Sequence, residues 1–64
     1  MATQPENGSP AEVYFEFTSY GRSVKVAAID AATGTEVTVI GPASAARADL
    51  ERLALQKLRA RLRK

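Results

Sequence analysis

The side chains that could do chemistry in this chain are carboxylates and a cluster of cations, because the sequence contains no cysteine and no histidine. Thiolate and imidazole ligand sets for zinc are therefore excluded, as is the commonest general base near neutral pH. The carboxylates of Glu12, Glu16 and Glu36 are predicted to lie on a flat, exposed face, which does not exclude water from a reacting group. No phosphate-binding glycine loop, nucleophile motif or metal-ligand spacing occurs. We therefore expect no catalytic residues, no metal and no cofactor.

The cations near the C-terminus form the strongest candidate contact surface. Residues 47–64 carry seven basic and two acidic residues, a net charge of +5, whereas residues 1–46 carry two basic and five acidic residues, a net charge of −3. A basic cluster attracts phosphate-rich partners such as nucleic acids whatever their sequence. The simpler explanation is a solvated helix face whose last-turn bases suit its dipole. The candidate phosphate contacts are Arg47, Arg52, Arg59, Arg61, Arg63 and Lys64.

The start of the same helix is a second candidate for anion binding. Residues 41–47 combine small side chains, backbone N–H groups without helical partners and the guanidinium of Arg47. A capping box would place Glu or Gln at position 47, so Arg47 is unfavourable for the helix dipole there. A plain helix start, with Arg47 paired to Glu51 one turn later, is the alternative.

Three strands are predicted ahead of the helix. Residues 12–18 alternate strictly, with Val13, Phe15 and Phe17 on one side. Alternation resumes after the turn signal at 19–22, and again at 35–40 after the turn at 30–34. Residues 1–11 are rich in Pro, Gly, Asn and Ser, the composition of a disordered lead-in, which leaves one domain over residues 12–64.

The strand pairing can be predicted from the alternation. If Thr18 faces Ser23, then Phe17 meets Val24, Phe15 meets Val26, and Glu16 meets Lys25 as an opposite-charge pair. If Asp30 faces Thr35, the second hairpin brings Ala28 to Val37 and Val26 to Val39. Both hairpins then gather their apolar residues on one face of an antiparallel meander.

A C-terminal helix is predicted over residues 45–63, with Ser44 as its N-cap after the break at Gly41 and Pro42. Its apolar residues fill an arc of about 200°, which is wider than a three-stranded sheet needs. The predicted fold is therefore a two-layer α+β domain, a β-β-β-α meander covered on one face by the helix. The predicted core comprises Val13, Phe15, Phe17, Val24, Val26, Ala28, Val37, Val39, Leu50, Leu53, Ala54 and Leu58.

The outer face of the sheet is a candidate surface for a protein partner. Its predicted cross-strand rows are Glu12, Ile29, Glu36; Tyr14, Ala27, Thr38; and Glu16, Lys25, Ile40. The three carboxylates would repel phosphate, whereas Tyr14, Ile29 and Ile40 form a candidate partner face framed by acids. Alternatively, these three side chains are scattered exposed apolar residues of the kind that normal protein surfaces carry, without a binding role.

Self-association is a further expectation. Both outer strands, 12–18 and 35–40, are sheet edges without proline or an inward-pointing charge to discourage pairing. The wide apolar arc leaves Leu55 and Leu62 on a flank of the helix. We expect a homodimer through a strand edge or through this flank.

The chain resembles a family of small uncharacterised bacterial proteins that is classed as a domain of unknown function. The resemblance lies in the runs 13–17, 21–30, 33–37, 41–43 and 50–58, and covers residues 12–62. It implies a small cytoplasmic domain with no assigned activity and no functional residues to transfer. The absence of an apolar run long enough for a signal peptide or membrane span also favours the cytoplasm. The expected function is a non-enzymatic protein-interaction module; a nucleic-acid accessory protein is the alternative.

Overall fold

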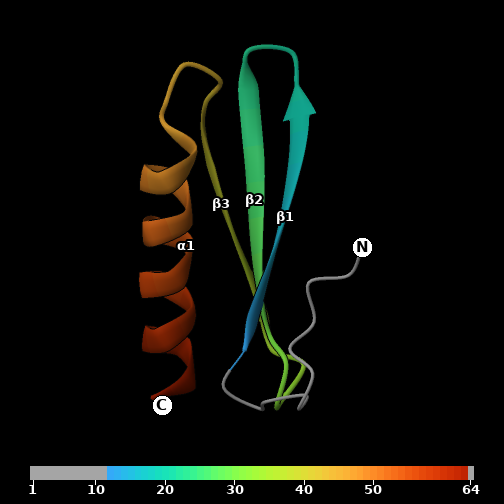
Figure 1. Cartoon of the computed structure of the whole chain (residues 1–64), viewed down its shortest axis with the longest axis vertical. Coiled ribbons are helices and arrows are strands. Elements are labelled where there is room, and N and C mark those ends of the chain that lie inside the picture. Colours follow the sequence, from blue (N-terminus) through green and yellow to red (C-terminus); the bar gives the residue numbers. More distant parts are fainter. Residues whose placement is uncertain (1–11, 64) are drawn as a thin grey trace.

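The computed structural model describes residues 12–63 of the chain. Three strands form one antiparallel sheet in the order β1-β2-β3, and a single helix follows them (Figure 1). The predicted α+β meander with a C-terminal helix is therefore confirmed. The lead-in predicted for residues 1–11 and the candidate contact Lys64 lie outside the described residues. The elements are β1 (Val13–Tyr20), β2 (Ser23–Asp30), β3 (Glu36–Pro42) and α1 (Arg47–Leu62).

The second hairpin has the predicted pairing. Ala28 faces Val37 and Val26 faces Val39. Its turn is held by Asp30, whose carboxylate accepts hydrogen bonds from the backbone N–H of Thr33 at 2.9 Å and from the Thr33 hydroxyl at 2.8 Å. Gly34 supplies the positive φ of 76° that closes the turn. A buried aspartate therefore fixes this connection by its own hydrogen bonds.

The register of the first hairpin differs from the predicted register by two residues. Tyr20 faces Ser23, Phe17 faces Val26 and Glu16 faces Ala27, so the predicted pair of Glu16 with Lys25 does not form. Only Gly21 and Arg22 connect the strands, and of these only Gly21 has a positive φ, 58°. That is the pattern of a type II′ turn, whose twist suits a tight hairpin. A shift of two residues leaves every side chain on its predicted face, so the apolar pattern could not reveal it.

The helix starts two residues later than predicted. Its N-cap is Ala46, which makes no side-chain capping bond, so Ser44 was the wrong prediction. Ser44 instead lies in a turn in which the N–H of Ala45 donates to the carbonyl of Pro42 at 3.0 Å. Asp49 in the first turn and Arg59 and Arg61 in the last turn have the signs that the helix dipole favours.

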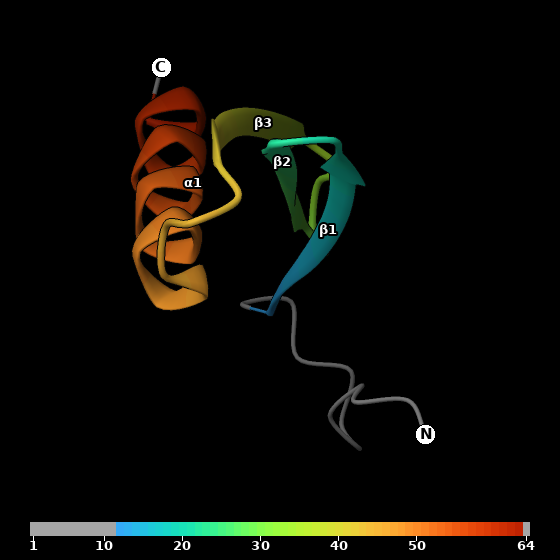
Figure 2. The same ribbon diagram turned by 90° about the horizontal axis from the view of Figure 1, so that it is seen from above.

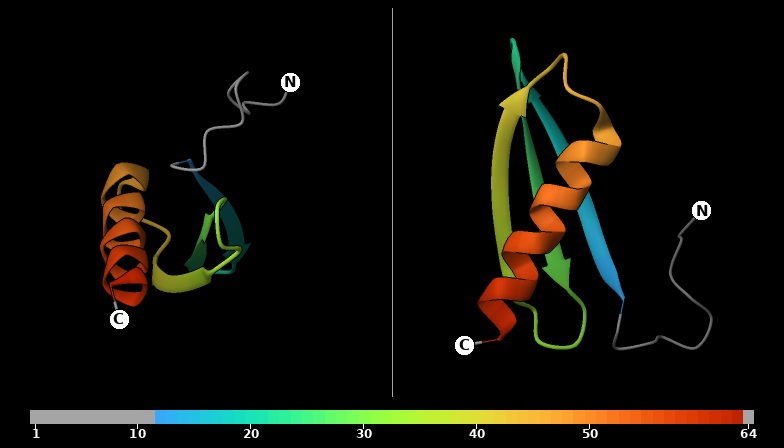
Figure 3. Two further views of the ribbon diagram at one scale, coloured as in Figure 1. Left: turned by 90° about the horizontal axis from the view of Figure 1, so that it is seen from below. Right: turned by 90° about the vertical axis from the view of Figure 1, so that its left-hand side faces the viewer.

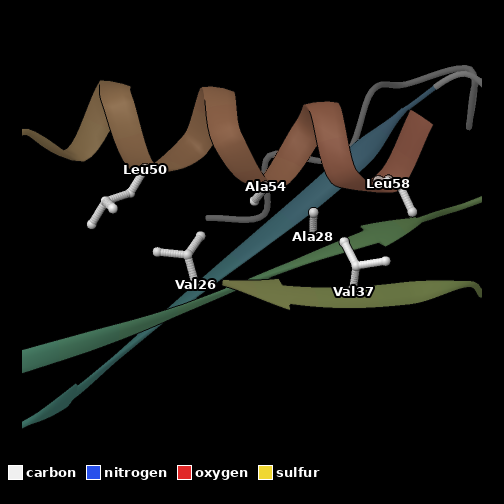
Figure 4. Close-up of a cluster of buried hydrophobic side chains, with 6 residues drawn as sticks. All are labelled: Val26, Ala28, Val37, Leu50, Ala54 and Leu58. Carbon is white, nitrogen blue, oxygen red and sulfur yellow. The ribbon is translucent and has the colours of Figure 1, made fainter. Parts of the chain in front are cut away.

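The core lies between α1 and the inner face of β2 and β3 (Figure 4). Leu50, Ala54 and Leu58 recur every four residues along the helix and are its buried residues. Leu53 was predicted in the core but is 53% exposed, because this narrow stripe, rather than the whole apolar arc, meets the sheet. The other predicted core residues are buried or packed against the core while partly exposed. The six residues of the buried cluster are Val26, Ala28, Val37, Leu50, Ala54 and Leu58.

Gly41 allows the helix to approach the end of β3. A Cβ atom at this position would lie 2.5 Å from Cδ2 of Leu50, which is closer than real Cβ atoms come to a neighbouring atom. Leu50 is itself 5% exposed. The missing side chain therefore makes room for the first buried leucine of the helix.

Candidate functional site

The outer face of the sheet brings only part of the predicted partner face together. Tyr14 faces Ile29 directly across the β1-β2 pair. Ile40 lies in the row of Thr18 and Lys25, two rows further along the strands, or about 13 Å away by the strand rise. The predicted rows change accordingly, because β1 is displaced by two residues. Tyr14 and Ile29 form one small pair, and Ile40 belongs to a different part of the face.

The phenol of Tyr14 on this face has a raised pKa. Burial raises the pKa of its phenol, and the nearby charge of Glu12 and a hydrogen bond with Glu12 raise it further. The raised pKa favours the protonated phenol, which can donate a hydrogen bond. This contact ties Tyr14 to the first described residue of the chain.

The large exposed side chains of the sheet lie toward its other end. Ile40 is 72% exposed and Tyr20 is 57% exposed. Tyr20 faces Ser23, which in turn faces Pro42, so Tyr20 lies one row beyond Ile40 on the same face. Sequence reasoning missed Tyr20, because the predicted first strand ended at Thr18; its place in the type II′ hairpin was the signal that could have found it.

The basic residues of the helix do not form one surface. Arg52, Arg59 and Arg63 follow each other at spacings of seven and four, opposite the buried stripe, so they point away from the sheet. Arg52 lies 3.2 Å from the carboxylate of Asp49, with both side chains exposed. Such an exposed pair contributes little to stability, but it partly neutralises the charge of this face. Three of the six predicted phosphate contacts therefore share a face.

Arg47 belongs to a different surface. Its guanidinium lies over the ring of Phe17 on β1, 3.9 Å from the ring centroid. A cation over an aromatic face contributes about 0.5–1 kcal/mol at an exposed site. This contact, rather than the predicted pairing with Glu51, occupies the side chain. It also joins the first turn of the helix to β1.

The helix start offers fewer free donors than predicted. The N–H of Ala43 donates to the carbonyl of Arg22 at 2.7 Å, and that of Ala45 donates to Pro42. Gly41 and Pro42 are residues of β3 rather than of the helix start. Two of the backbone donors invoked for the anion site at 41–47 are therefore already used within the fold.

Arg61 lies beside β3. A shallow cleft of about 240 Å³ is lined by Val37, Lys57, Ala60 and Arg61. In it the ammonium of Lys57 donates to the backbone carbonyl of Thr38 at 2.6 Å. Arg61 therefore lies on a different surface of the molecule from Arg52, Arg59 and Arg63.

The two edges of the sheet differ, although the sequence predicted them to be alike. The hydrogen bond from the N–H of Asp30 to Thr35 assigns the odd-numbered residues of β3 to the ladder with β2, so its even-numbered residues point outward. One of these outward carbonyls, that of Thr38, accepts the bond from Lys57. Another outward residue is Pro42, which has no N–H to offer. The edge of β3 is therefore obstructed at two positions.

The edge of β1 has no such obstruction among residues 12–63. The N–H of Ala31 donates to the carbonyl of Glu12, so the even-numbered residues of β1 bond with β2. Val13, Phe15, Phe17 and Ser19 therefore direct their backbone N–H and C=O groups away from the sheet. These groups form a row that another strand could pair with.

The helix also leaves the inner face of β1 partly uncovered. Its main packing is against β2 and β3, and the views along and across the sheet show α1 nearest β3 with β1 at the opposite margin (Figures 2 and 3). Val13, Phe15 and Phe17 consequently touch the core but stay half-buried. On the helix, half-buried Leu55 lies two turns after Arg47, on the side toward β1. Exposed Leu62 is in the last turn of the helix, which lies beside β3 (Figure 3). We call the open edge of β1, together with Val13, Phe15, Phe17 and Leu55, the β1 flank.

Two kinds of site are not found within the described part of the chain. No helix in residues 12–63 combines the length and apolar character that crossing a membrane requires. Nor does this part of the chain bring three or more Asp or Glu side chains together in a way that could hold a metal ion.

Comparison with known proteins identifies the family. No curated protein matches the chain. No solved structure matches it either. The family model described as "Domain of unknown function (DUF6898)" matches residues 10–64, which include every described strand and the helix. The chain therefore belongs to the DUF6898 family of domains of unknown function.

Proposed function

We propose that this domain is a non-enzymatic protein-binding module and that the β1 flank is its binding surface. The observation that carries the proposal is the position of α1, which packs on β2 and β3 and leaves the aromatic residues of β1 half-covered. A strand that pairs with β1 would gain backbone hydrogen bonds at the edge and apolar contacts with Phe15 and Phe17 at once. The outer-face residues Tyr14, Ile29 and Ile40 are the weaker alternative, because Ile40 lies apart from the other two.

Selection from a random peptide library tests this proposal. We expect the immobilised protein, held dilute, to enrich extended peptides with alternating apolar residues, as strand addition requires. Val13→Pro should weaken their binding at least tenfold, because it removes an outward N–H of β1 without breaking the ladder to β2. Glu36→Pro is the matched control, since it makes the same change at the first residue of β3.

A second variant covers the apolar part of the surface. Phe15→Lys should also weaken peptide binding at least tenfold, whereas Ile40→Lys on the outer face should leave it unchanged. Circular dichroism of each variant separates lost binding from lost folding. The proposal would be contradicted if no peptide is enriched, or if enriched peptides bind Val13→Pro and Phe15→Lys as well as the original protein.

The second candidate function is nucleic-acid association through the outward face of the helix. It is favoured by the alignment of Arg52, Arg59 and Arg63 on one side. Fluorescence anisotropy with duplex DNA and RNA would identify it by a loss of affinity of roughly tenfold or more between about 50 and 200 mM salt, since three phosphate contacts would be at stake. Binding to the β1 flank should respond little to this change in salt, because it relies on apolar contacts and backbone hydrogen bonds.

A further inference from the structure

We infer that the partner of the β1 flank is a second copy of this chain, which pairs antiparallel along β1 with a two-fold axis at Phe15. The inference rests on the proposed function and names its partner. The paired molecule has one continuous sheet in the strand order β3-β2-β1-β1-β2-β3. Both helices then lie on the same face of it, on either side of the aromatic residues of the two β1 strands.

The difference between the edges favours a closed dimer. β1 offers outward N–H and C=O groups at Val13, Phe15, Phe17 and Ser19, whereas the edge of β3 is obstructed by Lys57 and Pro42. Pairing through β1 therefore uses the same edge on both copies, which gives an isologous contact. The new outer edges of the assembly are the obstructed β3 strands, so the sheet does not extend further.

The charges of β1 and α1 select the register. An axis at Glu16 would place the two Glu16 carboxylates directly opposite each other, which is destabilising. An axis at Phe17 would bring together two phenylalanines that each carry an Arg47 guanidinium 3.9 Å above the ring, so two cations would meet. An axis at Tyr14 would place Glu12 opposite Glu16. Each of these registers opposes like charges.

An axis at Phe15 avoids these conflicts. Phe15 of one copy then faces Phe15 of the other, and Val13 faces Phe17, so every inner-face pair in this stretch is apolar. On the outer face Glu16 meets Tyr14 and Glu12 meets Thr18, so no carboxylate faces another. The residues of the inner-face pairs are those whose backbone groups point outward, so each facing pair exchanges both of its hydrogen bonds. Among the registers centred on residues 14 to 17, this is the one on which charge, packing and backbone pairing agree.

Sedimentation equilibrium measures whether the dimer exists. At about 0.5 mM we expect an average mass close to twice the 6.9 kDa of the chain, which requires a dissociation constant below about 50 μM. Val13→Pro should return the mass to that of the monomer, whereas Glu36→Pro should leave it doubled. A monomer at this concentration overturns the inference. The proposed function would still be tested by peptide binding to the β1 flank. A monomer that binds extended peptides would therefore contradict the dimer but not the binding module.

Single cysteines then test the register, because the chain has none of its own and any disulfide must join two copies. Phe15→Cys should form a disulfide-linked dimer under mild oxidation, since residues facing each other in a hydrogen-bonded pair have Cα atoms about 5.5 Å apart. Glu16→Cys and Phe17→Cys should link far more slowly, because this register places their Cα atoms more than about 7 Å apart. Ile40→Cys on β3 is the control for random collision. Fastest linkage at any of these other positions overturns the register, and at Ile40 it overturns the β1 interface itself.

Discussion

Replacing Leu58 by alanine is expected to destabilise the domain by about 2–5 kcal/mol, the largest effect of any single truncation within residues 12–63. Leu58 has no exposed surface and packs against Ala28 and Val37 from the last turns of the helix (Figure 4). Truncation removes apolar contacts and leaves a cavity that the small neighbouring side chain of Ala54 cannot fill. A domain of this length has a total stability of only about 3–10 kcal/mol, so the variant should lose much or all of its folded population.

Leu53→Ala is the matched control for this effect. It removes the same atoms from the same helix, but Leu53 is 53% exposed. Its expected cost is below about 1 kcal/mol, because little buried surface is lost. Urea denaturation followed by circular dichroism at 222 nm measures both variants. Equal destabilisation of the two would mean that α1 does not face the sheet through Leu50, Ala54 and Leu58.

Replacing Asp30 by alanine should have the second-largest effect, a loss of about 1.5–3 kcal/mol in the free energy of unfolding. The side chain is 8% exposed and accepts hydrogen bonds from both the backbone N–H and the hydroxyl of Thr33. Alanine would leave that N–H without its acceptor and would release the turn between β2 and β3. The core itself would not be altered.

Asp30→Asn is the control, because an amide keeps one acceptor oxygen in the same place. It should restore roughly half of the loss, since bonds to a neutral acceptor are weaker than bonds to a carboxylate. Chemical denaturation of the two variants gives the comparison directly. If Asp30→Ala were as stable as the original protein, the turn would be set by Gly34 and Thr35 rather than by this carboxylate.

The strands and their order could be predicted because they depend on periodicity. Alternation in β1 and β2 identifies the inner face whatever the exact pairing, and the Asp30 turn fixed the second hairpin correctly. The predicted register of the first hairpin was wrong by two residues. The apolar pattern repeats every two residues and so fits both registers, and Tyr20 was assigned to the turn rather than to β1. Here the loop geometry set by Gly21, rather than the apolar pattern, decided the register.

The candidate site was less predictable because it depends on where the helix lies across the sheet. The leucines of α1 cover a wide arc, and periodicity does not reveal that Leu50 and Leu58 would be buried while Leu53 is exposed. Nor does the sequence show that Lys57 reaches the carbonyl of Thr38 and so obstructs one edge. These are contacts between segments far apart in the chain. They make β1 the open side of the molecule.

Amide hydrogen exchange in β1 tests most directly the claim that this strand is the free binding edge. In a dilute sample, the amides of Phe15 and Phe17 should exchange quickly, because they point away from β2, whereas those of Glu16 and Thr18 should be protected by the ladder. NMR spectroscopy resolves the four amides. Slow exchange of Phe15 and Phe17 equal to that of Glu16 and Thr18 in the dilute protein would contradict the account, since the edge would already be covered within one copy.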